Sequence, residues 1–261
     1  MDQTDLEHAL RLADAADEIS MRHYRANDLV VKQKPDMSPV TQADTEVEHT
    51  LSSLVVNEFG ENYLGEEGTR EGSGGRIWIV DPIDGTKNYM RHMPVWASLI
   101  ALRDGDKTVV SVVSAPALGR RWWATLGGGA YTRDTDGMER PLRVSEVTEI
   151  GDAFLLTSTL SLWDDVPTGQ AAVMQLIDDV WRFRAPGDFI NYMLVAEGAA
   201  DICIEPNPKQ WDIEAPNLIV HEAGGSNWTS GTAETPATEP RINVATNGKL
   251  EAAVLEKLKL G

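Results

Sequence analysis

Residues 78–88 read WIVDPIDGTKN, an apolar run that leads directly into two aspartates, a proline and a glycine. The apolar part predicts a buried strand that ends on two carboxylates three residues apart, Asp81 and Asp84. Asp-Pro and Asp-Gly pairs both favour turns, so ordinary turn chemistry is one interpretation of this ending. A metal site at the end of the strand is the other.

The residues around the two aspartates favour the metal site. Pro82 lacks an N–H group, so we expect the strand's hydrogen-bond ladder to stop there and Asp81 and Asp84 to turn toward one point. Two such carboxylates repel each other unless a cation lies between them, and oxygen ligands suit Mg²⁺ or Mn²⁺ rather than Zn²⁺. If Gly85 and Thr86 open a helix, their N–H groups point at an anion, which turn chemistry alone does not predict.

Further carboxylates stand where other predicted elements begin or end, which is where sites are usually built. They are Asp44 at the start of a predicted helix, the pair Glu66–Glu67 in a glycine-rich loop, and Asp212 in the stretch PKQWDIEAP. Each has a simpler interpretation by itself, since Asp44 suits a helix N-cap and the GEEG loop suits a solvated surface. Together with the loop after Val80, they predict one metal site suited to phosphoryl chemistry.

Composition and charge exclude several other classes of protein. The 261 residues carry a formal net charge of −18, with 41 acidic residues against 23 basic ones, which disfavours nucleic acid and anionic membranes as partners. Such a surface attracts cations and also favours solubility. Cys203 is the only cysteine, so an internal disulfide and a cysteine-rich zinc site are excluded. Without a signal-like N-terminus or an apolar run of about 18 residues, we expect a cytoplasmic protein.

Hydrophobic periodicity predicts layered α/β structure in two lobes, residues 1–140 and residues 141–261. The first lobe carries most of the candidate metal ligands, and the second carries Asp212. Strands and hairpins are expected at 77–80, 98–102, 108–113, 120–126, 129–133, 154–158, 181–185, 200–205 and 242–246. Helices are expected at 5–25, 44–59, 168–180, 188–198, 212–223 and 248–259. Residues 65–75 and SGTAETPATEP (230–240) are expected to be loops.

Two long segments, WIVDPIDGTKNY and WDIEAPNLIVHEAGG, resemble the two signatures of the inositol monophosphatase family. KPDMSPVTQAD and LGEEG resemble the family's other metal-site segments, and all four occur in the family's order between Lys34 and Gly225. P-loop, dinucleotide-binding, zincin and nucleophile-elbow signatures are absent from the sequence. The resemblance implies an αβαβα fold, a Mg²⁺-dependent phosphomonoesterase with a small phosphorylated substrate, and a homodimer.

The resemblance also implies a role for each matching residue. Glu66, Asp81 and the backbone carbonyl of Ile83 would bind a first metal, and Asp81, Asp84 and Asp212 a second. A third, weaker ion would lie near Glu66, with Mn²⁺ as the alternative ion and Lys34 beside the outer metal. Asp44 and Thr86 would orient and deprotonate the attacking water, and the amides of Gly85 and Thr86 would bind the phosphate. The role of Glu67 stays open between a ligand and a residue behind the ligands.

The stretch Arg184-Ala-Pro-Gly-Asp188 resembles that of the family's histidinol-phosphatases, which act late in histidine biosynthesis. Asp188 and Glu205 would bind the ammonium and imidazole of the substrate, and Arg184 would hold the phosphate side or fix Asp188 through a salt bridge. Asp188 could instead cap the helix predicted at 188–198. Inositol monophosphatase and nucleotide 3′-phosphatase remain the alternatives, followed by a non-catalytic metal-dependent binder of phosphorylated ligands.

Overall fold

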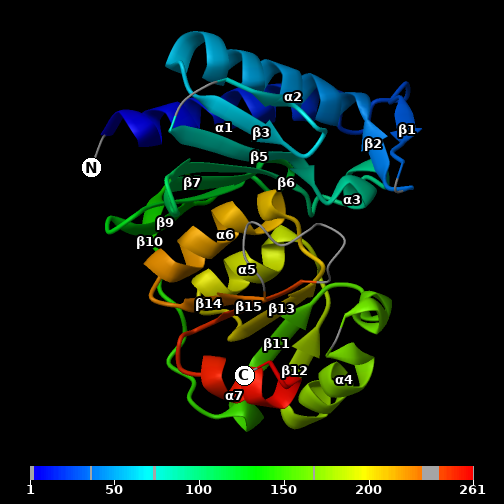
Figure 1. Cartoon of the computed structure of the whole chain (residues 1–261), viewed down its shortest axis with the longest axis vertical. Coiled ribbons are helices and arrows are strands. Elements are labelled where there is room, and N and C mark those ends of the chain that lie inside the picture. Colours follow the sequence, from blue (N-terminus) through cyan, green and yellow to red (C-terminus); the bar gives the residue numbers. More distant parts are fainter. Residues whose placement is uncertain (1–2, 36, 73–74, 167, 231–240, 261) are drawn as a thin grey trace.

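The computed structural model describes residues 3–35, 37–72, 75–166, 168–230 and 241–260. Its helices and sheets alternate in five layers (Figure 1). The outer helices α1 (Gln3–His23) and α2 (Gln42–Leu54) cover one sheet, and α5 (Phe189–Ala196) and α6 (Gln210–Glu222) lie between the two sheets. The helices α4 (Gly169–Asp179) and α7 (Glu251–Leu258) cover the far face of the second sheet. The αβαβα arrangement expected from the sequence is confirmed.

Within the described residues, the larger sheet has eight strands in the order β10-β9-β8-β7-β6-β5-β3-β4. Only β3 and β5 pair in parallel, and the other neighbours are antiparallel. The strands are β3 (Asn62–Gly65), β4 (Arg70–Glu71), β5 (Arg76–Asp84), β6 (Ala97–Asp104), β7 (Lys107–Ala115), β8 (Arg120–Thr125), β9 (Gly129–Arg133) and β10 (Glu139–Pro141). The short helix α3 (Thr86–Met90) follows β5 directly.

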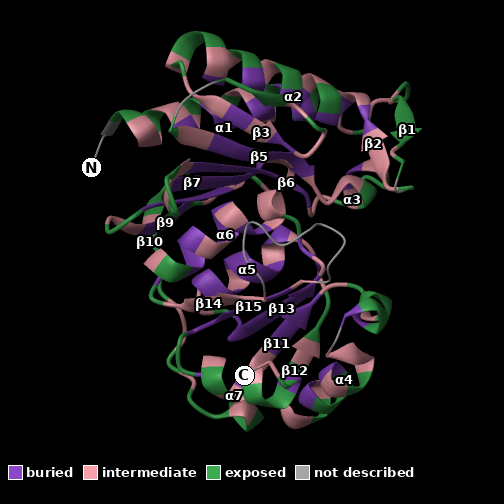
Figure 2. Ribbon diagram, viewed as in Figure 1, coloured by how far each residue is buried: buried purple, intermediate pink, exposed green. Residues whose placement is uncertain are grey.

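The second sheet has five strands among the described residues, in the order β12-β11-β13-β15-β14. Its strands are β11 (Phe154–Thr157), β12 (Arg182–Arg184), β13 (Ile202–Pro206), β14 (Ser226–Thr229) and β15 (Ile242–Thr246). A separate hairpin pairs β1 (Val31–Gln33) with β2 (Pro39–Thr41). Figure 2 shows burial concentrated in the two sheets and in the helices between them.

The helices α1 and α2 form because their apolar residues recur at helical spacing and meet the large sheet. Ala9, Leu12, Ala13 and Ala16 of α1 are all 0% exposed and pack in one cluster with residues of α2 and the sheet. The second helix continues beyond Leu54 as a π-helical turn, Val55–Phe59, which Gly60 ends with φ 69°. The two predicted helices are therefore confirmed. The first begins and ends two residues earlier than predicted, and the second begins two residues earlier, with its π-helical turn ending at Phe59 as predicted.

The strand that carries Asp81 does not end at Pro82, so that prediction is wrong. Asp81 pairs with Leu99 and Asp84 with Ala97, which leaves two residues of β5 opposite one residue of β6. This β-bulge absorbs the missing N–H of Pro82, and the hydroxyl of Ser98 donates to the Pro82 carbonyl at 2.7 Å. Residues three apart in a regular strand face opposite sides, so the extra residue allows both aspartates to serve one site.

Several short strands were not predicted from the sequence. They are β1, β2, β3, β4, β10 and β14, each of two to four residues. β4 lies inside the loop expected at 65–75, and most of the loop expected at 230–240 falls outside the described residues. The division into two lobes near residue 141 stays a prediction. In the described part of the chain, none of the helices combines the length and the apolarity needed to cross a membrane.

Candidate active site

Two adjoining cavities, of about 850 and about 220 Å³, are lined by residues of α3, of the end of β5, of the loop after β3 and of the first turns of α5 and α6. The predicted site residues that line one or both cavities are Glu66, Asp84, Gly85, Thr86, Asp188, Glu205 and Asp212. Asp188 and Asp212 line both cavities, so the two spaces form one region. The structure therefore brings residues from both halves of the chain to one place.

Of the two carboxylates of β5, Asp81 is buried and Asp84 is half-buried, and both lie close to other acids. Asp81 is 2% exposed and accepts a hydrogen bond from the backbone N–H of Ile83 at 3.0 Å. Asp84 accepts one from the backbone N–H of Phe189, the first residue of α5, at 2.6 Å. Burial raises the pKa of both aspartates well above its usual value, and the charge of Asp212 adds to the rise.

Asp212 stands in the first turn of α6, where its carboxylate accepts a hydrogen bond from the backbone N–H of Lys209 at 2.7 Å. Burial raises the pKa of Asp212 to about 7, and the negative charge of Glu66 contributes to the rise. Glu66 itself lies within hydrogen-bonding reach of Asp81. Four acidic side chains from β5, α6 and one loop thus repel one another in a partly closed space.

These carboxylates do not form a ready coordination shell. Among the described residues, no three His, Cys, Asp or Glu side chains are arranged so that they could hold a metal ion as they lie, and several accept hydrogen bonds from backbone amides instead. The donor set nevertheless fits a hard divalent cation, because every side chain offers oxygen and the repulsion between buried carboxylates needs a positive charge to offset it.

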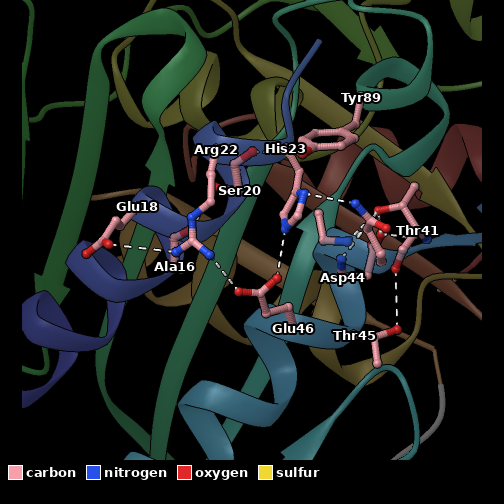
Figure 3. A network of polar contacts seen from close by, with 12 residues as sticks. Ala16, Glu18, Ser20, Arg22, His23, Thr41, Asp44, Thr45, Glu46 and Tyr89 are labelled. Atoms are coloured by element: carbon pink, nitrogen blue, oxygen red, sulfur yellow. Dashed lines mark hydrogen bonds and ion pairs between the residues drawn. The ribbon is translucent and has the colours of Figure 1, made fainter. Parts of the chain in front are cut away.

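Asp44 and Thr86 lie next to each other behind this cluster. Asp44 is 0% exposed, and its Oδ2 accepts hydrogen bonds from the backbone N–H and the hydroxyl of Thr41 at 2.8 and 2.5 Å (Figure 3). Thr41, rather than Asp44, is therefore the N-cap of α2. The Thr86 hydroxyl lies 3.4 Å from Asp44 and 3.1 Å from the Ile83 carbonyl. Burial raises the pKa of Asp44 to about 6.

The loop that carries Glu66 and Glu67 is held by a residue that sequence reasoning missed. Glu48 of α2 is 2% exposed, and its carboxylate accepts hydrogen bonds from the backbone N–H groups of Glu67 and Thr69 at 2.8 and 2.9 Å. The sequence did contain a pattern that could have pointed to Glu48, because it follows Asp44 by four residues and so lies on the same helix face. From the other side, the ammonium of Lys34 lies 2.8 Å from Glu66 and 2.7 Å from Glu67.

We expect Gly65→Ala to destabilise the protein by disrupting this loop. A Cβ atom at Gly65 would lie 2.1 Å from Oε2 of Glu48, so the carboxylate would have to leave the two amides that it binds. Leaving such buried groups unpaired costs about 1–3 kcal/mol, which thermal unfolding would register as a fall in Tm of roughly 2–12 °C.

The matched control is Gly151→Ala, because a Cβ atom there meets nothing within 4 Å and the backbone needs no positive φ. The two variants lose the same backbone freedom, so they differ only in the contact with Glu48. Equal Tm values for the two variants would contradict the proposed support of the loop by Glu48.

Asp188 precedes α5 but does not cap it with its side chain. The first N–H of the helix is taken by Asp84 instead. The Asp188 carboxylate accepts a hydrogen bond from the amide of Asn88 at 2.9 Å, and Lys87 partly offsets the rise in its pKa caused by burial. Its φ of 58° lies in a region that side-chain-bearing residues rarely adopt, and such strain concentrates at functional sites.

Arg184 is turned away from Asp188. Its side chain is exposed and donates a hydrogen bond to the carbonyl of Phe183 at 2.7 Å. No ion pair joins Arg184 to an acid within the described ranges, so the salt bridge expected with Asp188 is not formed. The cause is the short strand β12, whose exposed edge leaves the guanidinium in solvent.

Glu205 lies in β13, where it is 8% exposed and faces the smaller cavity. The amide of Asn191 donates a hydrogen bond to its Oε1 at 2.6 Å. Burial raises the pKa of Glu205 to about 8, and the charges of Asp188 and Asp212 contribute to the rise. A cation entering this cavity would therefore meet carboxylates whose ionisation it favours.

Comparison with known proteins shows which family the chain is similar to. Residues 1–260 match the sequence profile of the inositol monophosphatase family. The chain is 46% identical to a histidinol-phosphatase of Mycobacterium tuberculosis over 100% of both chains. It is 44% identical to a histidinol-phosphatase of Streptomyces coelicolor over 96% of this chain and 95% of the other.

Among solved structures, the extragenic suppressor protein suhB from Bartonella henselae superposes with a TM-score of 0.86 at 26% identity. That match covers 99% of this chain and 100% of the other. The profile spans nearly the whole sequence, and the full-length relatives exceed 40% identity. The chain therefore belongs to the inositol monophosphatase family.

Proposed function

We propose that this protein is a metal-dependent phosphomonoesterase that hydrolyses L-histidinol phosphate to L-histidinol and phosphate. The observation that carries the choice of substrate is a pair of carboxylates, half-buried Asp188 and buried Glu205, that line the cavity next to Asp84 and Asp212. Such carboxylates suit an ammonium or imidazole group better than a neutral polyol. The names of the two bacterial relatives point to the same ester.

The proposed metal ligands are the oxygen donors predicted from the sequence. Glu66, Asp81 and the carbonyl of Ile83 would hold one Mg²⁺ ion, and Asp81, Asp84 and Asp212 a second. A third, weaker ion would lie near Glu66, and Mn²⁺ is the alternative metal. When bound, such ions lower the pKa of water and offset negative charge on the attacking and leaving oxygens.

The remaining roles belong to the chain's own groups. Asp44 would accept the proton of the attacking water, and the Thr86 hydroxyl would hold that water in line with the phosphorus. The backbone amides of Gly85 and Thr86 would bind the phosphate oxygens. Asp188 and Glu205 would bind the organic half through charge-assisted hydrogen bonds. The homodimer implied by the family resemblance and the cytoplasmic location expected from the sequence are part of this proposal.

The test compares phosphate release from three esters by protein that has been stripped with a chelator and restored with Mg²⁺. We expect a clear preference for L-histidinol phosphate over inositol 1-phosphate and adenosine 3′,5′-bisphosphate. Preference for inositol 1-phosphate would keep the phosphatase chemistry and discard the cationic pocket. No release from any ester, with or without metal, would favour a non-catalytic binder.

Asp188→Ser tests whether the Asp188 carboxylate binds the substrate or has only a structural role. If the carboxylate binds a cation, its removal should lower kcat/KM for L-histidinol phosphate by about 10- to 150-fold, the range for a charge-assisted hydrogen bond. The same change should affect inositol 1-phosphate far less. Steady-state kinetics on both esters measure the difference, and equal losses on both would reduce Asp188 to a structural residue at the start of α5.

A further inference from the structure

Tyr192 of α5 has a buried hydroxyl with no hydrogen-bond partner among the described residues. The residue is 3% exposed, and it lines the smaller cavity together with Asp84, Glu205 and Asp212. A buried hydroxyl without a partner is uncommon because it costs about 1–3 kcal/mol. Its position therefore calls for an explanation.

The acidic residues nearest to this hydroxyl also line the smaller cavity. Burial raises the pKa of Tyr192 well above its usual value, and the neighbouring Cys203, Glu205, Asp212 and Asp84 raise it further. Three of these four neighbours are carboxylates that line the cavity. The fourth, the buried thiol of Cys203, lies within reach of a hydrogen bond from the Tyr192 hydroxyl, but a neutral thiol is only a weak acceptor that a substrate nitrogen can replace.

The carboxylates around the hydroxyl cannot donate a hydrogen bond to the substrate when they are ionised. In their ionised form Asp188 and Glu205 can only accept hydrogen bonds, so in that form they suit the N–H groups of a substrate. Glu205 is fixed in place by the amide of Asn191 and by a hydrogen bond with Ser158. A nitrogen that carries a lone pair instead of a proton needs a donor, and the Tyr192 O–H is a donor with no oxygen or nitrogen acceptor among the described residues.

We propose that Tyr192 is a specificity-determining residue whose hydroxyl donates a hydrogen bond to an unprotonated ring nitrogen of the substrate, while Glu205 accepts one from the ring N–H. This inference rests on the proposed function and deepens it. The cavity then selects a ring that offers one donor and one acceptor, which is the pattern of a neutral imidazole. Tyr192 reads the leaving group and takes no part in the chemistry at phosphorus.

Tyr192→Phe tests the proposal, since it removes only the hydroxyl. The experiment measures kcat/KM for L-histidinol phosphate and for n-propyl phosphate, whose organic half has no nitrogen. We expect the ratio of the two values to fall about 2- to 12-fold, the range for one neutral hydrogen bond, with the change in KM rather than kcat. Calorimetry with L-histidinol, which carries no phosphate, should show a matching loss of affinity.

Tyr63→Phe is the matched control. The Tyr63 hydroxyl is also buried and without a partner among the described residues, but Tyr63 lines neither cavity. We expect its ratio and its affinity for L-histidinol to equal those of the wild type. Tm values of both variants show whether either change disturbs the fold.

The outcomes separate this inference from the proposed function. The role of Tyr192 alone is overturned if the wild type prefers L-histidinol phosphate but Tyr192→Phe leaves two quantities unchanged. These are the ratio of the two kcat/KM values and the affinity for L-histidinol. A wild type that neither prefers this ester nor binds L-histidinol overturns both. Equal falls in Tyr192→Phe and Tyr63→Phe would assign the effect to the loss of any buried hydroxyl and would also overturn the inference.

Discussion

An Asp81→Asn variant is expected to lose at least about 1,000-fold in kcat, because Asp81 is the residue proposed to bind both main metal ions and metal charge stabilisation contributes several kcal/mol. The amide keeps an oxygen that can accept the hydrogen bond from the Ile83 N–H, so the local backbone should stay in place. Phosphate release at saturating Mg²⁺ measures the loss. Activity close to that of the wild type would defeat the metal assignment.

The same substitution should stabilise the protein when no metal is present. Burial raises the pKa of Asp81, so the folded state binds this proton more tightly than the unfolded chain does. Stability is then lost as the pH rises from the unfolded pKa of about 4 through the folded pKa, because the unfolded chain gives up this proton freely while the folded state can ionise Asp81 only beside Glu66, Asp84 and Asp212. Asparagine has no proton to lose, so its advantage should grow with pH.

Thermal unfolding in a chelator at pH 5 and pH 8 measures this advantage. Relative to the wild type, we expect a higher Tm for Asp81→Asn at pH 8 and a smaller difference at pH 5. Asp178→Asn, an exposed substitution on α4, is the control for the change in net charge. A variant that loses both activity and metal-free stability would point to a disturbed fold instead.

An Asp44→Asn variant should lose about 100- to 10,000-fold in kcat, the range associated with general acid–base catalysis. The side chain keeps an oxygen for the Thr41 N–H, and the substitution lies outside the proposed ligand set. Half-saturation by Mg²⁺ should therefore change much less than kcat, unlike in Asp81→Asn. This difference separates the residue that takes the proton from the residues that bind the metal.

The pH dependence of kcat gives a second test of Asp44. Burial raises its pKa to about 6, and the protonated carboxyl cannot accept a proton from water. Wild-type kcat should fall as the pH drops through this region, and the residual activity of Asp44→Asn should lack that acid limb. A loss below about tenfold, or the same acid limb in the variant, would assign the base to another group.

Local sequence patterns predicted the helices, the longer strands and the segments that meet at the site. WIVDPIDGTKN carries its information in adjacent residues, so its strand and its two carboxylates could be predicted directly. The contacts of Glu48 with the amides of Glu67 and Thr69 could not be predicted from the sequence, because they depend on how α2 lies against the large sheet. The bulge at Pro82 and Ile83 also depends on the register of β6, which hydrophobic alternation does not specify.

The orientation of Arg184 was missed for a similar reason. The sequence places it four residues before Asp188, but β12 is a three-residue edge strand that sends its side chain toward solvent. Asp188, in contrast, contacts Asn88, which lies 100 positions earlier in the chain. Pairings over such separations follow from the stacking of the layers, which local patterns do not encode.

Two of the contacts that build the site span such distances. The bonds from Phe189 to Asp84 and from Asn88 to Asp188 join positions 105 and 100 residues apart. During folding, closing loops of this length is slow compared with forming local helices and hairpins. The two sheets can therefore gain their secondary structure early, while the site forms only when the layers dock. The rate at which enzymatic activity returns after dilution from denaturant should therefore report this late docking step, which circular dichroism would not register.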